Sequence, residues 1–305
     1  YKNKGSNSNP EYSYITNNYF STLDIFSNSS PELIDIDNDG DLDLFIANQY
    51  DLSETPWVGK IYFFRNTGSE SNPQFEEETT SLLNENMGQM LSPEFGDLDG
   101  DGDMDLLVGD FNGFIQYFEN TSSNNNLTFS PIENVGNIDL SGNSVPTLGD
   151  LDGDGDLDML VGQLNGSLVF YRNVGNTSQY NFQIEPFDDI QVENNSAPEL
   201  FDVDGDGDID VISGSELDDK VAWYENNGAS DPSFTAHTVT TSADAMASVF
   251  AADVDGAGAT ATGAAAGTPN AVSKAFTNSA SSRTDRPFTS STNFSTFATD
   301  NLLFI

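Results

Sequence analysis

Short apolar runs recur along the chain, and each of them ends at a small residue. Runs of five or six apolar residues that are bounded by turn-forming residues are typical of β-strands buried on both faces. The pattern therefore predicts a buried strand at four places: Leu42–Ala47, Met104–Gly109, Leu157–Gly162 and Ile209–Gly214.

An aromatic segment that ends in asparagine follows each apolar run. Aromatic residues favour half-buried strands, so we expect these segments to pack in the core between neighbouring sheets rather than to stack on a ligand. The four aromatic segments are Tyr62–Asn66, Gln116–Asn120, Val169–Asn173 and Ala222–Asn226.

These landmarks define a repeat that contains four predicted strands. In the second repeat the strands are Pro93–Gly96, Met104–Gly109, Phe114–Glu119 and Leu127–Ile132. Repeats of about 50 residues with four strands are typical of β-propeller blades. We therefore predict an all-β propeller of six or seven four-stranded blades. It forms a single domain over residues 1–305, with repeats at 31–92, 93–145, 146–197, 198–248 and 249–286.

The two ends of the chain are expected to complete one blade. Residues 1–12 match residues 64–75, so the chain begins in the middle of a blade. We expect residues 287–305 to supply the inner strands of that blade and residues 1–30 its outer strands. A ring closed in this way hides sheet edges that would otherwise pair with other chains.

An acidic motif of nine residues precedes each apolar run and overlaps its start. Aspartates occupy its alternate positions, and they are Asp35, Asp37, Asp39, Asp41 and Asp43, then Asp97, Asp99, Asp101, Asp103 and Asp105, then Asp150, Asp152, Asp154, Asp156 and Asp158, and finally Asp202, Asp204, Asp206, Asp208 and Asp210. Two carboxylates about 4 Å apart repel by roughly 1 kcal/mol in water and roughly 4 kcal/mol at an effective dielectric constant of 20. A tight turn built from five of them therefore calls for a cation.

Calcium is the cation that this ligand set favours. Ca²⁺ takes oxygen ligands in a flexible geometry, whereas magnesium demands a strict octahedron and zinc prefers nitrogen or sulfur. In the third motif we assign side-chain ligands to Asp150, Asp152, Asp154 and Asp158, and a backbone carbonyl ligand to Asp156. Gly155 permits the turn because glycine tolerates positive φ. We expect about four Ca²⁺ ions in all.

A fifth copy of the motif begins at Asp253 and then fails. It keeps only Asp253 and Asp255, too few carboxylates to hold calcium well. From Ala257 onward alanine, threonine, serine and glycine dominate, so no residue-level prediction is drawn from that part of the chain.

The motif and its flanking strands resemble the FG-GAP/VCBS repeats of calcium-bearing propellers, a family that includes the integrin α-subunit head. Segments such as Ser92–Asp97 and Asp218–Asn226 are similar to repeats of secreted bacterial proteins, those of Bacteroidota especially. The resemblance covers residues 1–256. It implies an extracellular or cell-surface module with a role in adhesion, carbohydrate binding or assembly, in which calcium braces the hairpins.

Charge and composition narrow the range of partners. The formal net charge is −41, and four calcium ions would leave −33, which disfavours nucleic acid and anionic membrane surfaces. No stretch approaches the 18 to 20 apolar residues of a membrane span, so direct membrane insertion is not expected. The chain begins at Tyr1 without a signal peptide, and we expect it to belong to a longer secreted protein with neighbouring domains.

Three functions remain open at this stage. The first is a non-enzymatic module that binds a protein or glycan ligand, with a contact site in the extra loop of the first repeat at Tyr50, Pro56 and Trp57. The second is a carbohydrate-active enzyme, a polysaccharide lyase or glycosidase, in which a carboxylate pair performs acid–base catalysis. The third is a structural spacer or assembly domain of an adhesin or filament. The sequence favours the first, because the recognisable chemistry is that of calcium loops.

Overall fold

The fold was analysed in a computed structural model of the chain. The structure describes residues 29–241 with gaps at 52–56, 70–71, 84–86, 124–125, 133–137, 139, 141, 188–189, 191, 193, 195 and 215–219. It also describes five short terminal strands: β1 (Lys2–Asn3), β2 (Tyr12–Ser13), β19 (Ser273–Lys274), β20 (Phe297–Thr299) and β21 (Leu302–Phe304).

Four antiparallel sheets of four strands each make up the main body, and each sheet uses its strands in chain order. The first contains β3 (Ser29–Ile34), β4 (Asp43–Asn48), β5 (Ile61–Asn66) and β6 (Phe75–Thr79). The second contains β7 (Ser92–Gly96), β8 (Asp105–Gly109), β9 (Ile115–Asn120) and β10 (Phe129–Ile132). The third contains β11 (Val145–Gly149), β12 (Asp158–Gly162), β13 (Leu168–Asn173) and β14 (Phe182–Glu185). The fourth contains β15 (Ala197–Phe201), β16 (Asp210–Gly214), β17 (Val221–Asn226) and β18 (Phe234–Thr240).

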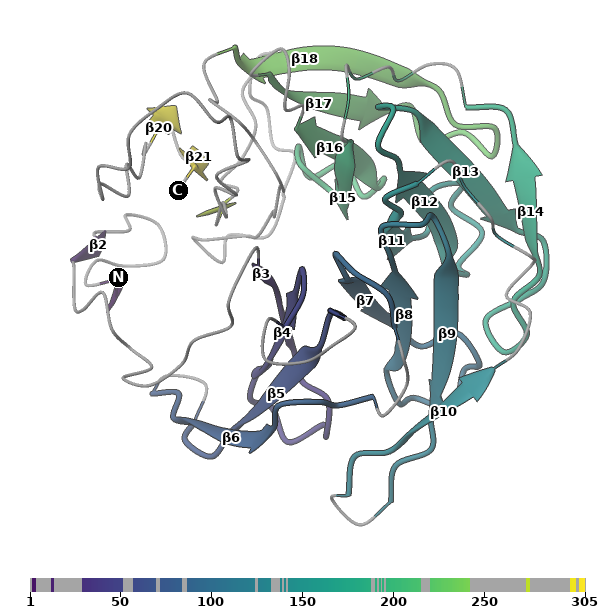
Figure 1. Cartoon of the computed structure of the whole chain (residues 1–305). Coiled ribbons are helices and arrows are strands. Elements are labelled where there is room, and N and C mark those ends of the chain that lie inside the picture. The colour runs from purple at the N-terminus through teal and green to yellow at the C-terminus, as the bar shows by residue number, and fades with distance from the viewer. Residues whose placement is uncertain are drawn as a thin grey trace.

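The sheets are arranged as the blades of a propeller. Strands β3, β7, β11 and β15 lie nearest the centre, and β6, β10, β14 and β18 lie at the rim (Figure 1). The predicted strands of the second repeat agree with the observed ones to within two residues. The predicted all-β propeller of four-stranded blades is therefore confirmed.

The second strand of each blade is buried on both faces, and in the second and third blades this strand lies between two neighbouring blades. Every residue of β4, β8, β12 and β16 is buried. Alternate side chains point to opposite neighbours: Leu106 of β8 packs with Phe45 of the first blade, whereas Leu107 packs with Met159 of the third. The predicted core role of the aromatic segments is confirmed by Phe63 and Phe118, which lie in the first of these clusters.

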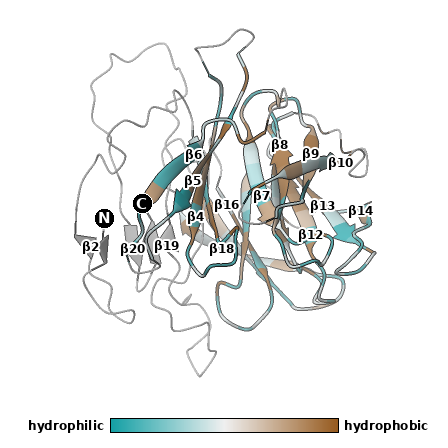
Figure 2. Cartoon of the chain, turned by 90° about the horizontal axis from the view of Figure 1, so that it is seen from below, coloured by the Kyte–Doolittle hydropathy of each residue, from teal (hydrophilic) through white to brown (hydrophobic). Residues whose placement is uncertain are grey.

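Outer strands are more polar than the inner ones. In Figure 2 β6 and β14 are largely hydrophilic, whereas β8 and β9 carry hydrophobic residues. The exposed face of an edge strand needs polar side chains, because an apolar edge would pair with other chains.

The blades are also joined at the end where β8 turns into β9 and β12 into β13, which we call the hairpin end. The hydroxyl of Ser144, just before β11, accepts a hydrogen bond from the backbone of Asp110 at 3.0 Å and donates one to Phe114 at 2.7 Å. Gly109 lies against Ser144, and a side chain at Gly109 would collide with the Ser144 carbonyl. The small residue predicted at the end of each apolar run thus lets the next blade approach.

Two predictions about the ends of the chain are not met. Four complete blades are described rather than six or seven. The terminal strands form two separate sheets, β1–β2 and β19–β21–β20, so the shared closing blade is not found among the described residues. Strand β19 pairs in parallel with β21, whereas a blade requires antiparallel pairing. The sequence after residue 256 lacks the acidic motif and the apolar run that direct blade pairing elsewhere, which explains the difference.

Candidate metal centres

The four acidic motifs form equivalent turns between the first and second strands of the blades. They lie between β3 and β4, β7 and β8, β11 and β12, and β15 and β16. We call them loops 1 to 4, and the end of the propeller that carries them the loop end. It is opposite the hairpin end, because β4, β8, β12 and β16 run from one to the other.

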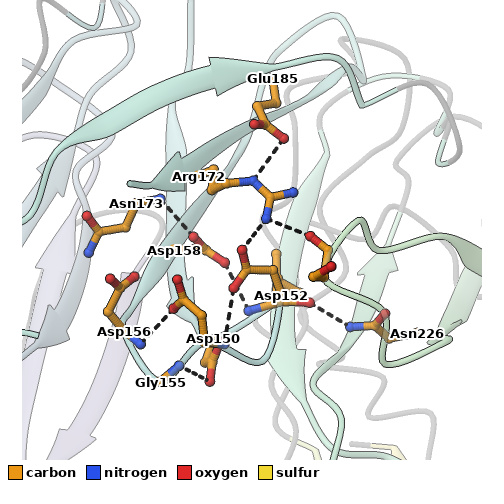
Figure 3. Close-up of polar contacts among 12 residues, drawn as sticks. Asp150, Asp152, Gly155, Asp156, Asp158, Arg172, Asn173, Glu185 and Asn226 are labelled. Atoms are coloured by element: carbon orange, nitrogen blue, oxygen red, sulfur yellow. Dashed lines mark hydrogen bonds and ion pairs between the residues drawn. The ribbon is translucent and has the colours of Figure 1, made fainter. Parts of the chain in front are cut away.

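The first aspartate of each loop holds the turn by accepting backbone hydrogen bonds. In loop 3 the Asp150 carboxylate accepts one from Asp154 at 3.1 Å and one from Gly155 at 3.0 Å (Figure 3). Asp35 accepts the equivalent pair of bonds in loop 1, whereas Asp97 and Asp202 accept bonds from the fourth and sixth residues of their loops. The carboxylate therefore lies inside the turn with its position fixed.

Backbone conformation explains the glycine at the sixth position of each loop. Gly155 has a φ of +95°, and the space where its side chain would stand is open. Only the left-handed backbone therefore favours glycine there. This confirms the role predicted for Gly155. The fourth position is left-handed as well, with Gly153 at +74° and Asn38 of loop 1 at +57°.

Each loop brings carboxylate oxygens to within 4.8 Å of one another. The groups are Asp35, Asp37 and Asp39, then Asp97, Asp99 and Asp101, then Asp150, Asp152 and Asp158, and finally Asp202, Asp204 and Asp206. The structure thus brings together twelve of the twenty aspartates assigned to metal from the sequence. Of the side-chain ligands predicted for loop 3, Asp154 lies outside its group, and the backbone carbonyl of Asp156 stays a predicted ligand. The eight aspartates outside the groups are Asp41, Asp43, Asp103, Asp105, Asp154, Asp156, Asp208 and Asp210.

Three buried oxygen atoms support the fit of a cation to these loops. In the described part of the chain, Oδ1 of Asp37, Oδ2 of Asp43 and Oδ1 of Asp156 are buried and accept no hydrogen bond. A buried oxygen without a partner costs free energy, and a cation would remove that cost. Together with the all-oxygen ligand set, they fit a hard divalent cation such as Ca²⁺.

The last aspartate of each loop has a structural task that the sequence did not predict. Asp105 is buried, and its carboxylate accepts hydrogen bonds from the backbone of Asn120 at 2.8 Å, the backbone of Leu98 at 3.1 Å and the hydroxyl of Tyr117 at 2.8 Å. Asp158 and Asp210 accept the same two backbone bonds, and Asp43 accepts that from Asn66. This residue fastens the loop to the third strand of its blade.

The asparagine that ends each aromatic segment completes this fastening. The side-chain amide nitrogen of Asn120 donates to the carbonyl of Met104 at 3.0 Å, and the side-chain oxygen of Asn120 accepts a hydrogen bond from the backbone of Ser122 at 3.1 Å. The sequence analysis used these asparagines only as landmarks. Their nearly constant distance from the acidic motif was the available signal of a contact.

Burial raises the pKa of several loop carboxyls because it penalises their charged form. It raises the pKa of Asp43, Asp156 and Asp210 to about 6, and that of Asp158 to about 7. Neighbouring loop aspartates raise these pKa values further, while backbone hydrogen bonds lower those of Asp43, Asp158 and Asp210. The metal-free loops therefore hold negative charge at a cost that a bound cation would offset.

Loops 2 and 3 lie close to the next blade. The side chain of Asn226 in the fourth blade donates to the carbonyl of Leu151 in loop 3 at 3.0 Å (Figure 3). Gly100 of loop 2 lies against Thr177 and Ser178 of the third blade. A cavity of about 470 Å³ opens beside this contact, and Asp99 and Tyr180 are among the residues that line it. These two candidate metal centres therefore lie between neighbouring blades.

The predicted partner site lies at the hairpin end, away from the metal loops. The rings of Tyr50 and Trp57 stack with their centroids 5.7 Å apart, and Trp57 is 52% exposed. Pro56, the third residue of this site, lies outside the described residues.

Comparison with family models gives a match over most of the chain. The model described as FG-GAP-like repeat matches four overlapping segments, 35–108, 101–161, 150–213 and 202–260. Three of these segments begin at the first aspartate of a loop. A search of curated proteins finds no match.

The fastening role of the last aspartate can be tested within loop 2. We expect D105A to lower the free energy of unfolding of the EDTA-treated chain by roughly 2–4 kcal/mol. Each buried donor left without an acceptor costs about 1–3 kcal/mol, and loss of the buried charge offsets part of this. D101A is the matched control, since Asp101 is exposed and accepts only the Asp103 amide at 2.9 Å. Equal effects of the two variants in urea denaturation would contradict the assignment.

The raised pKa values predict how the metal-free chain responds to pH. Between about pH 4 and pH 7 the folded chain binds more protons at these carboxyls than the unfolded chain does, so its stability falls as the pH rises. The melting temperature in EDTA should be higher at pH 5 than at pH 8, a range that stays above the sequence pI of about 4.1. D158N removes one of these titrating carboxyls, so it should make the melting temperature depend less steeply on pH. A melting temperature that is flat or rises with pH would refute this prediction.

Proposed function

The chain belongs to the FG-GAP-like repeat family, and from this premise we propose that it is a calcium-stabilised module that binds a protein or glycan partner. We propose further that it acts outside the cell or at the cell surface as part of a longer secreted protein, without catalytic activity. The observation that carries the proposal is the recurrence of one carboxylate group in each of the four loops.

Calcium in this proposal stabilises the fold. Bound to carboxylates of the four groups, it would neutralise negative charge that the loops otherwise hold at a cost. Because loops 2 and 3 rest against the next blade, their ordering would also support that blade. Extracellular modules bind calcium with dissociation constants of about 10⁻⁴–10⁻³ M, which suits the calcium level outside cells.

The location of the protein is inferred from the calcium requirement and from the family resemblance. Among the described residues there is no helix with the length and apolar character needed to span a bilayer.

The partner surface is placed at the hairpin end, where aromatic side chains of two blades are exposed. The side chain of Gln89 donates to the carbonyl of Trp57 at 3.1 Å, and the carbonyl of Gln89 accepts a hydrogen bond from Phe111 at 2.8 Å. Trp57 is 52% exposed and Phe111 44%. Aromatic residues of this kind supply much of the binding energy at protein interfaces, and their rings also suit stacking on sugars.

The single histidine supports a non-catalytic interpretation. Its ring stacks on Trp223 with centroids 4.4 Å apart, and Nε2 of His237 lies 2.7 Å from a carboxylate oxygen of Glu225. These contacts give His237 a packing role on the outer strand of the fourth blade.

Calcium should raise the stability of the whole chain. At about 1 mM calcium each site adds roughly 0.4–1.4 kcal/mol if its dissociation constant is about 10⁻⁴–10⁻³ M. We expect the melting temperature at pH 7.5 to rise by several degrees with calcium and to return to its starting value with excess EDTA. Magnesium at the same concentration is the control and should raise it less. A melting temperature that is indifferent to EDTA would exclude calcium stabilisation.

Partner binding should depend on the exposed aromatic residues of the hairpin end. The chain is tested for binding to an array of immobilised polysaccharides and to surface proteins of cultured cells. W57A should weaken the strongest interaction at least about tenfold, as expected for a central aromatic residue. I184A is the control, because Ile184 is exposed on the outer strand β14. Unchanged binding by W57A would reject this surface, and cleavage of any polysaccharide on the array would reject the non-enzymatic proposal.

A further inference from the structure

One residue position divides the four metal loops into two kinds. It is the residue directly before the asparagine that fastens the last loop aspartate, at the end of the third strand of each blade. The position holds Arg65 in the first blade, Glu119 in the second, Arg172 in the third and Glu225 in the fourth. Its charge therefore alternates from blade to blade.

In the third blade the arginine reaches into the metal loop. Nη1 of Arg172 donates to the carboxylate of Asp152, the third residue of loop 3 (Figure 3). Nε of Arg172 lies 3.0 Å from the carboxylate of Glu185 on β14, and Nη1 also donates to the carbonyl of Ser230 at 2.8 Å. The guanidinium lies over the ring of Phe170, 5.6 Å from its centroid. Four different contacts thus hold it in place.

The first blade repeats this arrangement with different residues. Nη1 of Arg65 donates to the carboxylate of Asp37, again the third residue of its loop, and Nε donates to Glu78 at 2.7 Å. The guanidinium lies 5.2 Å from the centroid of the Phe63 ring. Recurrence in two blades shows that the contact follows from the position of the arginine in the blade.

The second and fourth blades place a negative charge at the same position. Burial raises the pKa of Asp204, the third residue of loop 4, and the charges of Asp206 and Glu225 raise it further. Burial likewise raises the pKa of Tyr180, as do the charges of Asp105 and Glu119, and Tyr180 lines the cavity beside Asp99 of loop 2. In the fourth blade the glutamate therefore adds to the charge around the loop, and in the second blade it adds to the charge around Tyr180, which lies beside Asp99 of loop 2.

The two kinds of loop differ in formal charge. Five aspartates, the arginine and the glutamate that the arginine also contacts give loops 1 and 3 a formal charge of −5, whereas five aspartates and one glutamate give loops 2 and 4 a formal charge of −6. The arginine also occupies an oxygen of an aspartate that belongs to the metal group. Ligand charge is one of the properties that tune the affinity of calcium loops over several orders of magnitude.

We propose that Arg65 and Arg172 are affinity-determining residues that make loops 1 and 3 weak calcium sites, while loops 2 and 4, which carry Glu119 and Glu225, are strong ones. This inference rests on the proposed calcium function. In loops 1 and 3 the guanidinium already neutralises part of the charge and competes for a ligand oxygen. In loops 2 and 4 calcium is the main source of positive charge, so it binds there first.

Calorimetric titration of the full, metal-free chain with Ca²⁺ tests the proposal. We expect two strong and two weak sites, with dissociation constants that differ by about tenfold or more. R65Q/R172Q should tighten the weak pair by at least about fivefold, because it frees the Asp37 and Asp152 oxygens. K60Q/K220Q is the matched control: it removes the same charge, but Lys60 pairs with Asp51 at the hairpin end and Lys220 lies over the Tyr224 ring.

A second pair of variants assigns the sites without removing an arginine. D99N/D204N should abolish the two strong sites, and D37N/D152N the two weak ones, which keeps the proposal testable if R65Q/R172Q fails to fold. Three outcomes would overturn the inference and leave calcium binding intact. The four sites could have equal affinity, K60Q/K220Q could tighten calcium binding as much as R65Q/R172Q does, or R65Q/R172Q could weaken it. A chain that binds no calcium at all would overturn the proposed calcium function together with it.

Discussion

The hydrogen bonds accepted by the last aspartate of each loop are the constraint on which each blade depends. The Asp105 carboxylate joins its own loop, through the backbone of Leu98, to the third strand β9. It accepts hydrogen bonds from two residues of β9, the backbone of Asn120 and the hydroxyl of the buried Tyr117. A turn with five negative charges has no intrinsic reason to adopt one shape, because its side chains repel. Anchoring the last carboxylate to backbone donors gives the turn a fixed position relative to the sheet. The buried apolar run starts directly after it, so the anchor also sets the register of the second strand.

This anchor has an electrostatic cost, since it buries a carboxylate next to other carboxylates. Burial raises the pKa of Asp158 to about 7, and the Asp152 charge adds to that rise while the Arg172 guanidinium lowers it. In the first and third blades an arginine of the same chain supplies positive charge beside the loop. In the second and fourth a glutamate stands at that position, so under the proposed calcium function the balancing charge comes from solution.

The sequence predicted the strands well because their signals are local. The apolar runs and the glycine at the sixth loop position depend on neighbouring residues alone, and β8 and Gly155 agree with expectation. The contact between Arg172 and Asp152 was not predicted, because it depends on a side-chain direction across twenty residues. The asparagine contact was missed for a different reason: Asn120 binds Asp105 through its backbone amide, which any residue except proline possesses. The predicted closing blade is not found among the described residues, and the segment assigned to it lacks the motif that directs pairing elsewhere.

Loops 2 and 3 contact the blade that follows their own, so a cation bound in either loop would affect two blades. Loop 3 touches the fourth blade through Asn226 and through Arg172, whose guanidinium donates to Ser230, and loop 2 touches the third blade at Thr177. At the opposite end Ser144 bridges the same two blades, the second and third, through its hydroxyl. Each seam between blades is therefore closed at the hairpin end by fixed hydrogen bonds and at the loop end by groups whose charge must be balanced. Under the proposed calcium function, cations would act on these contacts at the loop end, whereas the hydrogen bonds of the hairpin end do not depend on them.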